Sequence, residues 1–434
     1  MPDSRAQEQV TYDRKFLLFG AMLLFALRLG SRRAFDQDLR DMESEVLPNL
    51  NLLAGTEQTS LPVARTIDHL LQHVGGWQPL AELAHQCVHR LIRMKALDGF
   101  RLLGHVVIAV DGTGFLSFGQ RHCPHCLTQK HGDKTVYLHP VLEAKLVTPE
   151  GLCLSVATEF IENPGPITAA AEYTEQTKQD CELKAFARLA RQLKARFPQL
   201  RICISGDSIY GCGTCMEICR ENGWAYVVTF KPGRTPSLWK DFEALLKLEP
   251  HCRATQKATL PGDVHQVYDW VERLDYRDSE NRDWQPGAIR CRETDAQGQT
   301  TTFAWLTNLP VDRHSVQPLA NQGGRIRSKI ENEGFNVQKN SGLNLEHAYS
   351  LNWDRAKAYY FLLQIGHLMD QLVQHGSLHK ALAKEYGQET VAGLWGALKK
   401  IYERLREAFR THAFDPEDFD VEAAKRCHIS LNTS

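Results

Sequence analysis

The order of apolar runs between residues 105 and 230 is the strongest constraint on the fold. Runs rich in β-branched residues predict five strands, and amphipathic patterns between the later ones predict helices. The strands are expected at 106–110, 136–147, 152–161, 200–205 and 225–230, and the helices at 177–196 and directly after Tyr210. This β-β-β-α-β-α-β order is typical of a mixed sheet flanked by helices, and therefore of the α/β class.

Changes in pattern divide the chain of 434 residues into five segments. Residues 1–100 have helical spacing and predict a helical N-terminal domain, either a DNA-binding unit or a plain bundle. Residues 101–230 form the first part of the α/β core, and residues 231–311 interrupt it with a β-rich insertion. Residues 312–350 complete the core with a helix, and residues 351–434 form a helical C-terminal tail.

The longest apolar run, Phe16–Leu27, bears on membrane insertion and export. It is about twelve residues long, well short of the roughly 20 that a membrane-spanning helix needs. A secretory signal is the alternative, but Arg28, Arg32 and Arg33 stand where a small-residue cleavage site belongs. We therefore expect a buried helix and no membrane association.

The charge balance limits which partners are expected, and the cysteine content limits which cellular location is expected. The chain has 51 Lys and Arg against 52 Asp and Glu, so any basic surface for a nucleic acid must be local. Its 12 cysteines are too sparse for a disulfide scaffold, which favours reduced thiols and a cytoplasmic location.

Two aspartates follow predicted strands that lie far apart in the sequence. Asp111 stands in Ala-Val-Asp-Gly-Thr-Gly and Asp207 in Ser-Gly-Asp-Ser-Ile-Tyr-Gly. Ligands of open α/β sheets bind beyond the carboxyl ends of strands, where two carboxylates can hold divalent cations. The alternative for each aspartate alone is a turn-forming residue that caps its own backbone.

A charged helix expected from about residue 317 to 338 supplies a third carboxylate. Arg327 and Glu331 are four residues apart and share one helix face, as in a solvated surface helix. Glu333 lies on a different face, together with the apolar residues Ile326 and Ile330. The ion-pair spacing favours Glu331 and the apolar stripe favours Glu333, so at most one of them faces the sheet.

Taken together, these motifs resemble the catalytic core of insertion-sequence transposases of the DDE class. The similarity covers roughly residues 100–375 and includes "HCPHCLTQKH", "KQDCELKA" and "RSKIENEGFN" followed by Lys339. The family implies a ribonuclease H-like mixed sheet with two carboxylates after strands, a glutamate on a later helix, and often a β-rich insertion before that helix. The chain departs from the family signature at Gly324, where a tyrosine is usual, and Lys339 lies one residue late.

The resemblance implies that Asp111, Asp207 and Glu331 are both the catalytic and the metal-binding residues. They would hold two Mg²⁺ ions, for which Mn²⁺ can substitute, and Arg327 and Lys339 would contact DNA phosphates. The expected function is a DNA transposase that cleaves the element ends and transfers the strands into target DNA. It would act as a homodimer or larger oligomer on DNA.

Two other functions stay open. One is a metal-dependent nuclease that stops at hydrolysis, and the other is a DNA-binding protein derived from a transposase, in which the acidic residues are structural.

A Cys-x-x-Cys pair, Cys123 and Cys126, is the main motif that points to a site other than the carboxylates. Histidines flank it, so it has the character of half a structural zinc site. The alternative is that both thiols brace a loop. The second pair, Cys212 and Cys215, lies too far along the chain for a zinc ribbon, and its helical spacing predicts packing as small apolar residues.

Overall fold

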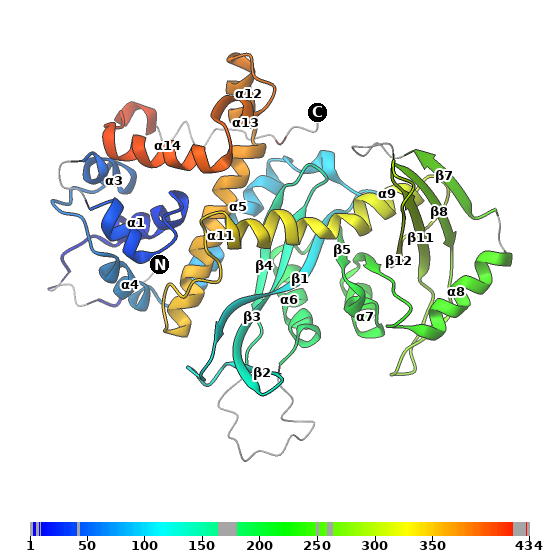
Figure 1. Ribbon diagram of the computed structural model, residues 1–434. Coiled ribbons are helices and arrows are strands. Elements are labelled where there is room, and N and C mark those ends of the chain that lie inside the picture. Colours follow the sequence, from blue (N-terminus) through cyan, green and yellow to red (C-terminus); the bar gives the residue numbers. More distant parts are fainter. Residues whose placement is uncertain are drawn as a thin grey trace. The chain divides into compact units, whose positions relative to one another are not determined.

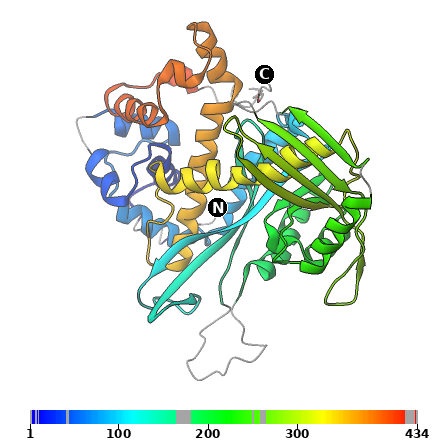
Figure 2. The ribbon, with the colours of Figure 1, turned by 45° about the vertical axis from the view of Figure 1, so that its right-hand side comes forward.

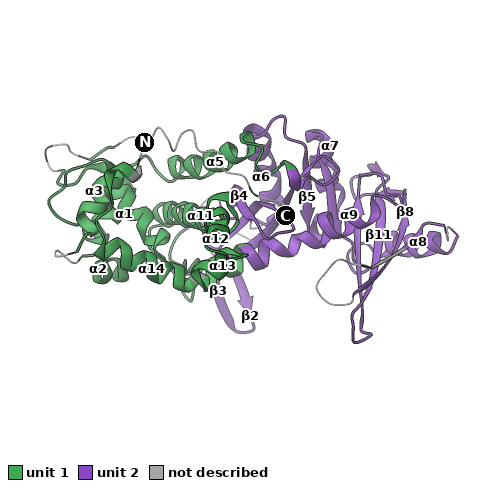
Figure 3. Ribbon diagram, turned by 90° about the horizontal axis from the view of Figure 1, so that it is seen from above, with its two compact units in different colours: residues 1–98, 115–123, 334–434 green, residues 99–114, 124–333 purple. Residues whose placement is uncertain are grey.

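The computed structural model divides into two compact units (Figure 3). Unit 1 combines Met1–Asp98, Phe115–Cys123 and Gly334–Ser434, and unit 2 combines Gly99–Gly114 with Pro124–Glu333. The structure describes residues 3–5, 8, 10–40, 44–163, 180–248, 251–257, 264–419 and 431. Strand β1 and the helical segment 316–340 cross from one unit into the other.

Unit 1 is built of helices. They are α1 (Arg14–Ala26), α2 (Arg32–Asp38), α3 (Val46–Ala54), α4 (Ala64–His73), α5 (Gln78–Arg93), α10 (Val337–Asn340), α11 (Trp353–His375), α12 (Ser377–Glu385), α13 (Val391–Trp395) and α14 (Leu398–Thr411). The first five occupy the N-terminal stretch in which apolar spacing predicts helices, and the last four occupy the predicted helical tail.

The core of unit 1 forms around α1 and α11, which pack against each other. Asp13 caps α1 by accepting the Lys15 N–H at 2.6 Å, and the apolar run then buries Phe16 and Phe25 completely. The run is thus a buried helix, as its length predicts. Within the described residues, no helix is both long enough and apolar enough to cross a membrane.

Unit 2 is built on one mixed sheet of ten strands (Figure 1). Its order is β2-β3-β1-β5-β6-β12-β11-β8-β7, with β4 on β3. The strands are β1 (Val106–Phe118), β2 (Leu127–His131), β3 (Lys134–Val147), β4 (Cys153–Phe160), β5 (Ile202–Gly206), β6 (Ala225–Thr229), β7 (Arg253–Lys257), β8 (His265–Val271), β11 (Gly287–Thr294) and β12 (Thr300–Thr307). The mixed α/β class agrees with the prediction.

Strands β1, β5 and β6 are parallel neighbours at the centre of this sheet. Antiparallel hairpins join β2 to β3 and β3 to β4, the latter turning at Gly151 with a φ of 99°. The sequence pattern misses β2, because its residues Leu-Thr-Gln-Lys-His are mostly polar and half-exposed or exposed.

The β-rich segment 231–311 is not a separate sheet. Strand β12 pairs antiparallel with β6, and β11, β8 and β7 follow outward, so the segment widens the central sheet (Figure 2). Helix α8 (Pro236–Leu248) precedes these strands, and β9 (Tyr276–Arg277) and β10 (Asp283–Trp284) form a small two-stranded ribbon.

Helices lie on both faces of the sheet (Figure 3). Helix α6 (Glu182–Arg196) packs on β3 and β4, and α7 (Gly213–Asn222) packs on β6. The predicted start of α6 at residue 177 lies outside the described residues. On the other face, residues 319–324 pack against β5, β6 and β12, and residues 325–327 pack against β5. These residues belong to the helical segment 316–340. It comprises α9 (Val316–Pro318), the π-helical η5 (Leu319–Gly324), η6 (Arg325–Arg327), the π-helical η7 (Ile330–Asn336) and α10.

Candidate active site

Asp111 lies on β1, and Asp207 directly follows β5, the parallel neighbour of β1. Val106 pairs with Ile202, and the register continues to Ala109 opposite Ser205. Asp111 is two residues beyond Ala109, and Asp207 is two residues beyond Ser205. Because side chains two apart share a face of a strand, the register assigns both aspartates to the same edge and face.

Each aspartate also makes the local backbone contact that a turn residue makes. The Gly112 N–H donates to Oδ1 of Asp111 at 3.1 Å, and the Ile209 N–H donates to Oδ1 of Asp207 at 2.8 Å. One carboxylate oxygen of each residue is therefore used to shape its loop. A turn-forming role and a metal-binding role are compatible, because each carboxylate has a second oxygen, which in Asp111 is the one that accepts from Arg327.

Arg327 connects Asp111 to the later helical segment. Its Nη1 donates to Oδ2 of Asp111 at 2.9 Å, and its Nη2 pairs with Oε1 of Glu331 at 2.8 Å. The negative charge of Glu331 lies near enough to raise the pKa of Asp111. The guanidinium thus holds two of the three predicted carboxylates together, although they lie more than 200 residues apart in the sequence.

Side chains of the sheet contact the backbone of the segment 316–340 at Gly323 and Gly324. Ser205 Oγ donates to the Gly323 carbonyl at 2.6 Å, and a Cβ built on Gly324 would meet Nε1 of Trp305 at 2.2 Å. No larger side chain fits at residue 324 without moving Trp305. Residue 324 is therefore a position at which glycine is required unless Trp305 moves.

The structure brings Glu331, and not Glu333, to Asp111. Glu333 pairs with Lys329 at 3.4 Å. The apolar stripe favours Glu333 on the assumption of a regular α-helix, whereas the π-helical turn from Ile330 to Asn336 is wider than an α-turn and changes which residues share a face.

Glu182, in the first turn of α6, is a fourth carboxylate at this place and was not predicted. Tyr210 donates its hydroxyl to Oε1 of Glu182 at 2.6 Å. A Cβ on Gly112 would lie 3.0 Å from Oε2 of Glu182, so this carboxylate lies directly against the loop after Asp111. The sequence offered one signal, the motif "KQDCELKA", but nothing in it assigns Glu182 a partner.

The clustering of acids changes their protonation. The pKa of Asp111 is raised to about 7: burial is the largest cause, Arg327 opposes it, and the charges of Glu331 and Glu182 add to it. Burial also raises the pKa of Glu182, and the charge of Asp207 acts in the same direction. These mutual effects indicate that Asp111, Asp207, Glu182 and Glu331 share one electrostatic environment with the guanidinium of Arg327.

The donor set suits a hard divalent cation. Carboxylate oxygens are the ligands that Mg²⁺ and Mn²⁺ prefer, and a cation would relieve the repulsion that raises the pKa of Asp111. In the described part of the chain, no three acidic side chains have ligand oxygens all within 4.8 Å of one another. Metal binding would therefore draw the carboxylates inward from their present positions around Arg327.

Lys339, predicted to contact DNA, belongs to unit 1. Its Nζ pairs with Oε1 of Glu346 at 2.7 Å. The three predicted carboxylates and Arg327 all belong to unit 2.

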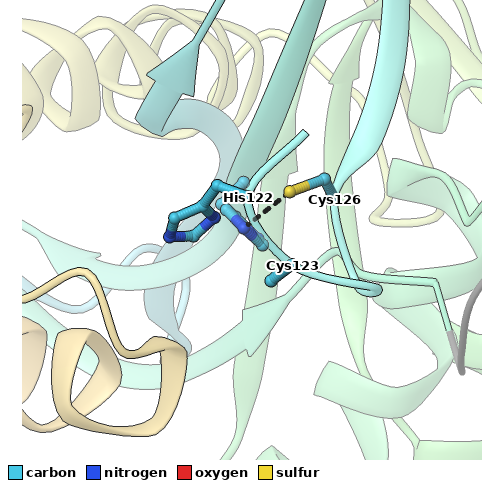
Figure 4. A group of neighbouring side chains, drawn as sticks. His122, Cys123 and Cys126 are labelled. Carbon is cyan, nitrogen blue, oxygen red and sulfur yellow. Dashed lines mark hydrogen bonds between the residues drawn. The ribbon is translucent and has the colours of Figure 1, made fainter. Parts of the chain in front are cut away.

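The predicted half zinc site at Cys123 and Cys126 has two histidines beside it. Ligand atoms of His122, Cys123, Cys126 and His139 all lie within 4.8 Å of one another (Figure 4). His139 could not be foreseen, since the polar strand β2 that brings it there was not predicted. The other pair, Cys212 and Cys215, lies at the start of α7 with its sulfur atoms 3.6 Å apart.

No protein-family model matches the chain, and no curated protein matches it significantly.

Proposed function

We propose that the chain is a DNA transposase of the DDE class that cleaves element ends and joins them to target DNA. The observation that carries this proposal is the placement of Asp111 on β1 and of Asp207 directly after the adjacent parallel strand β5, with Arg327 paired to both Asp111 and Glu331. This is the order and element type that the family requires. The strand order β4-β3-β1-β5-β6 with a later helix on one face supports a ribonuclease H-like core.

Asp111, Asp207 and Glu331 would hold two Mg²⁺ ions, or Mn²⁺ in their place. When bound, these ions would activate a water or 3′-hydroxyl oxygen for attack and would stabilise the departing oxygen. Before metal binding, Arg327 offsets the negative charge of Asp111 and Glu331. Glu182 adds a fourth negative charge beside Gly112, and Tyr210 holds its orientation.

Within unit 1, helix α5 offers a surface suited to a phosphate backbone. A hollow of about 640 Å³ on it is lined by Gln86, His89, Arg90, Arg93 and Met94. Arginines bind phosphates through paired donors, so this hollow is a candidate DNA contact in the helical N-terminal domain. We also propose an oligomer on DNA, because two element ends must be brought together for joining.

The test is strand cleavage and joining by Asp111→Asn with labelled DNA carrying the element ends. The expected result is loss of both cleavage and joining with DNA binding retained, since the variant removes a metal-binding charge and keeps the side-chain size. A matched control is Asp283→Asn, which alters an exposed aspartate paired with Arg277.

Three other outcomes would count against the proposal. Retained cleavage by Asp111→Asn would remove the metal-binding role of this residue. Cleaved but never joined products from the unmodified chain would favour a nuclease. DNA binding without any metal-dependent cleavage would favour a DNA-binding protein descended from a transposase.

A further inference from the structure

We propose that His122, Cys123, Cys126 and His139 form a structural zinc site, separate from the acidic residues. Two thiolates and two imidazoles are a ligand set that Zn²⁺ takes in closed, four-coordinate sites. The four side chains offer ligand atoms that all lie within 4.8 Å of one another. This inference does not depend on the proposed transposase function.

The local chain course alone brings these residues together. All four lie in the continuous stretch 122–139, which includes the β2–β3 hairpin. In that hairpin Leu127 pairs with Leu138, so the next positions outward, Cys126 and His139, face each other. Cys123 is three residues before Cys126, the spacing at which two thiolates chelate one zinc ion.

The distances suit a metal held between the side chains. Sγ of Cys126 lies 3.2 Å from Nε2 of His139, and both residues are completely buried. Zn–S and Zn–N bonds of about 2.3 and 2.05 Å at tetrahedral angles place sulfur and nitrogen about 3.6 Å apart. Small side-chain adjustments would therefore admit the ion. Figure 4 labels three of the four candidate ligands, His122, Cys123 and Cys126.

Neighbouring backbone groups orient the ligands. Nε2 of His122 lies 2.8 Å from the Leu351 carbonyl, to which it donates, and this leaves Nδ1 for the metal. The loop between the cysteines is fixed by Asn163, whose Nδ2 donates to the Cys126 carbonyl at 2.9 Å. Nδ1 of His125 donates to the Asn163 carbonyl at 2.9 Å, so His125 supports the loop from outside the ligand set.

A closed set of four protein ligands leaves no open coordination position for substrate, so the site would be structural. Zinc there would cross-link the connection that follows β1 to strand β3. The polar hairpin β2–β3 has few buried apolar side chains of its own at its tip, and the metal would supply the missing stabilisation.

The test measures zinc bound to the full chain, purified with zinc in the medium and freed of loosely held metal on a desalting column. The expected result is one zinc per chain, with at least about a tenfold loss in Cys123→Ser and Cys126→Ser. The matched control is the double variant Cys212→Ser and Cys215→Ser, which alters a pair of the same spacing and should keep its zinc. Cobalt(II) added to the zinc-free chain should give a thiolate-to-cobalt charge-transfer band that Cys123→Ser weakens.

Absence of bound zinc from the unmodified chain, or equal zinc in Cys123→Ser and the control, would overturn the proposal. Loss of zinc from the Cys212/Cys215 variant alone would place the metal elsewhere and also overturn it. Cys123 is half-exposed, so Cys123→Ser keeps the test decisive if Cys126→Ser fails to fold.

Discussion

Arg327 donates to Asp111 across the sheet edge at 2.9 Å, and the same guanidinium reaches Glu331 at 2.8 Å. Only a planar, forked cation can bridge two carboxylates in this way. We expect Arg327→Lys to reduce metal-dependent strand cleavage by about 10²–10³-fold, comparable to losing one preorganised donor at a reacting centre. Single-turnover cleavage measures the effect, and full activity in Arg327→Lys would show that the bridge is dispensable.

Glu331 and Glu333 form a matched pair for a second prediction. Glu331→Gln should abolish cleavage because it removes the carboxylate that lies next to Asp111. Glu333→Gln should retain cleavage within a few-fold, since Glu333 pairs with Lys329. The reverse pattern would show that Glu333 is the third catalytic carboxylate.

The hollow on α5 predicts a change in the salt dependence of DNA binding. Replacing both Arg90 and Arg93 with alanine should weaken binding and lower the slope of log affinity against log salt by about 2. Binding titrations at several salt concentrations measure this slope. Replacing Arg277, whose charge pairs with Asp283 in the other unit, provides the comparison, and an equal slope in both variants would exclude α5 from the interface.

Cys212 should be the most reactive described thiol near neutral pH. The hydrogen bond from Cys215 lowers the pKa of Cys212 to about 6, with backbone N–H groups at the start of α7 acting in the same direction. A thiol with this pKa is mostly thiolate at pH 7, so alkylation at residue 212 should rise between pH 5 and 7 and then level off. The exposed Cys181 is the comparison, and an alkylation rate at Cys212 still rising steeply above pH 8 would contradict the prediction.

A buried ion pair in unit 1 predicts a stability effect. Arg28 and Asp370 are 5% and 1% exposed, and Tyr402 donates its hydroxyl to the same carboxylate. Arg28→Met should lower the free energy of unfolding by about 3–5 kcal/mol at pH 7, because it leaves a buried charge without its partner.

The same variant has a defined pH dependence. Burial raises the pKa of Asp370 even with Arg28 in place, and removal of the guanidinium raises it further. A carboxyl whose pKa is raised in the folded chain destabilises that chain when ionised, and the penalty fades as pH falls and the group is protonated. Urea unfolding at pH 7 and pH 5 should show a smaller loss at pH 5, and an equal loss at both would contradict this account.

Local patterns predicted much of the fold and part of the site. Asp111 and Asp207 follow strands whose β-branched runs are unmistakable, and Arg327 and Glu331 have the spacing of a helical ion pair. Each of these features is encoded within a few neighbouring residues. Their relative placement was inferred from the family resemblance and from the rule that parallel strands end at one edge.

The residues that sequence reasoning missed depend on tertiary contacts. Glu182 lies at the start of α6, which Arg188 connects to the sheet. Arg188 pairs with Glu159 of β4 at 2.5 Å and with Asp180 at 2.6 Å. His139 meets Cys126 through a hairpin whose strand lacks an apolar pattern. The direction in which Glu331 points depends on π-helical turns, and the 3.6-residue period of an α-helix does not reproduce their spacing.

The pairing of β12 with β6 sets an order for folding on the ribosome. Strand β6 ends at Thr229, but its outer neighbour β12 is complete only after Thr307 has been synthesised. Until then, the growing chain presents the outer backbone N–H and C=O groups of β6 as an open edge, and such edges recruit other strands. While the β-rich segment is being translated, both aspartates have therefore been synthesised, but the sheet that positions them still has an unpaired edge at β6.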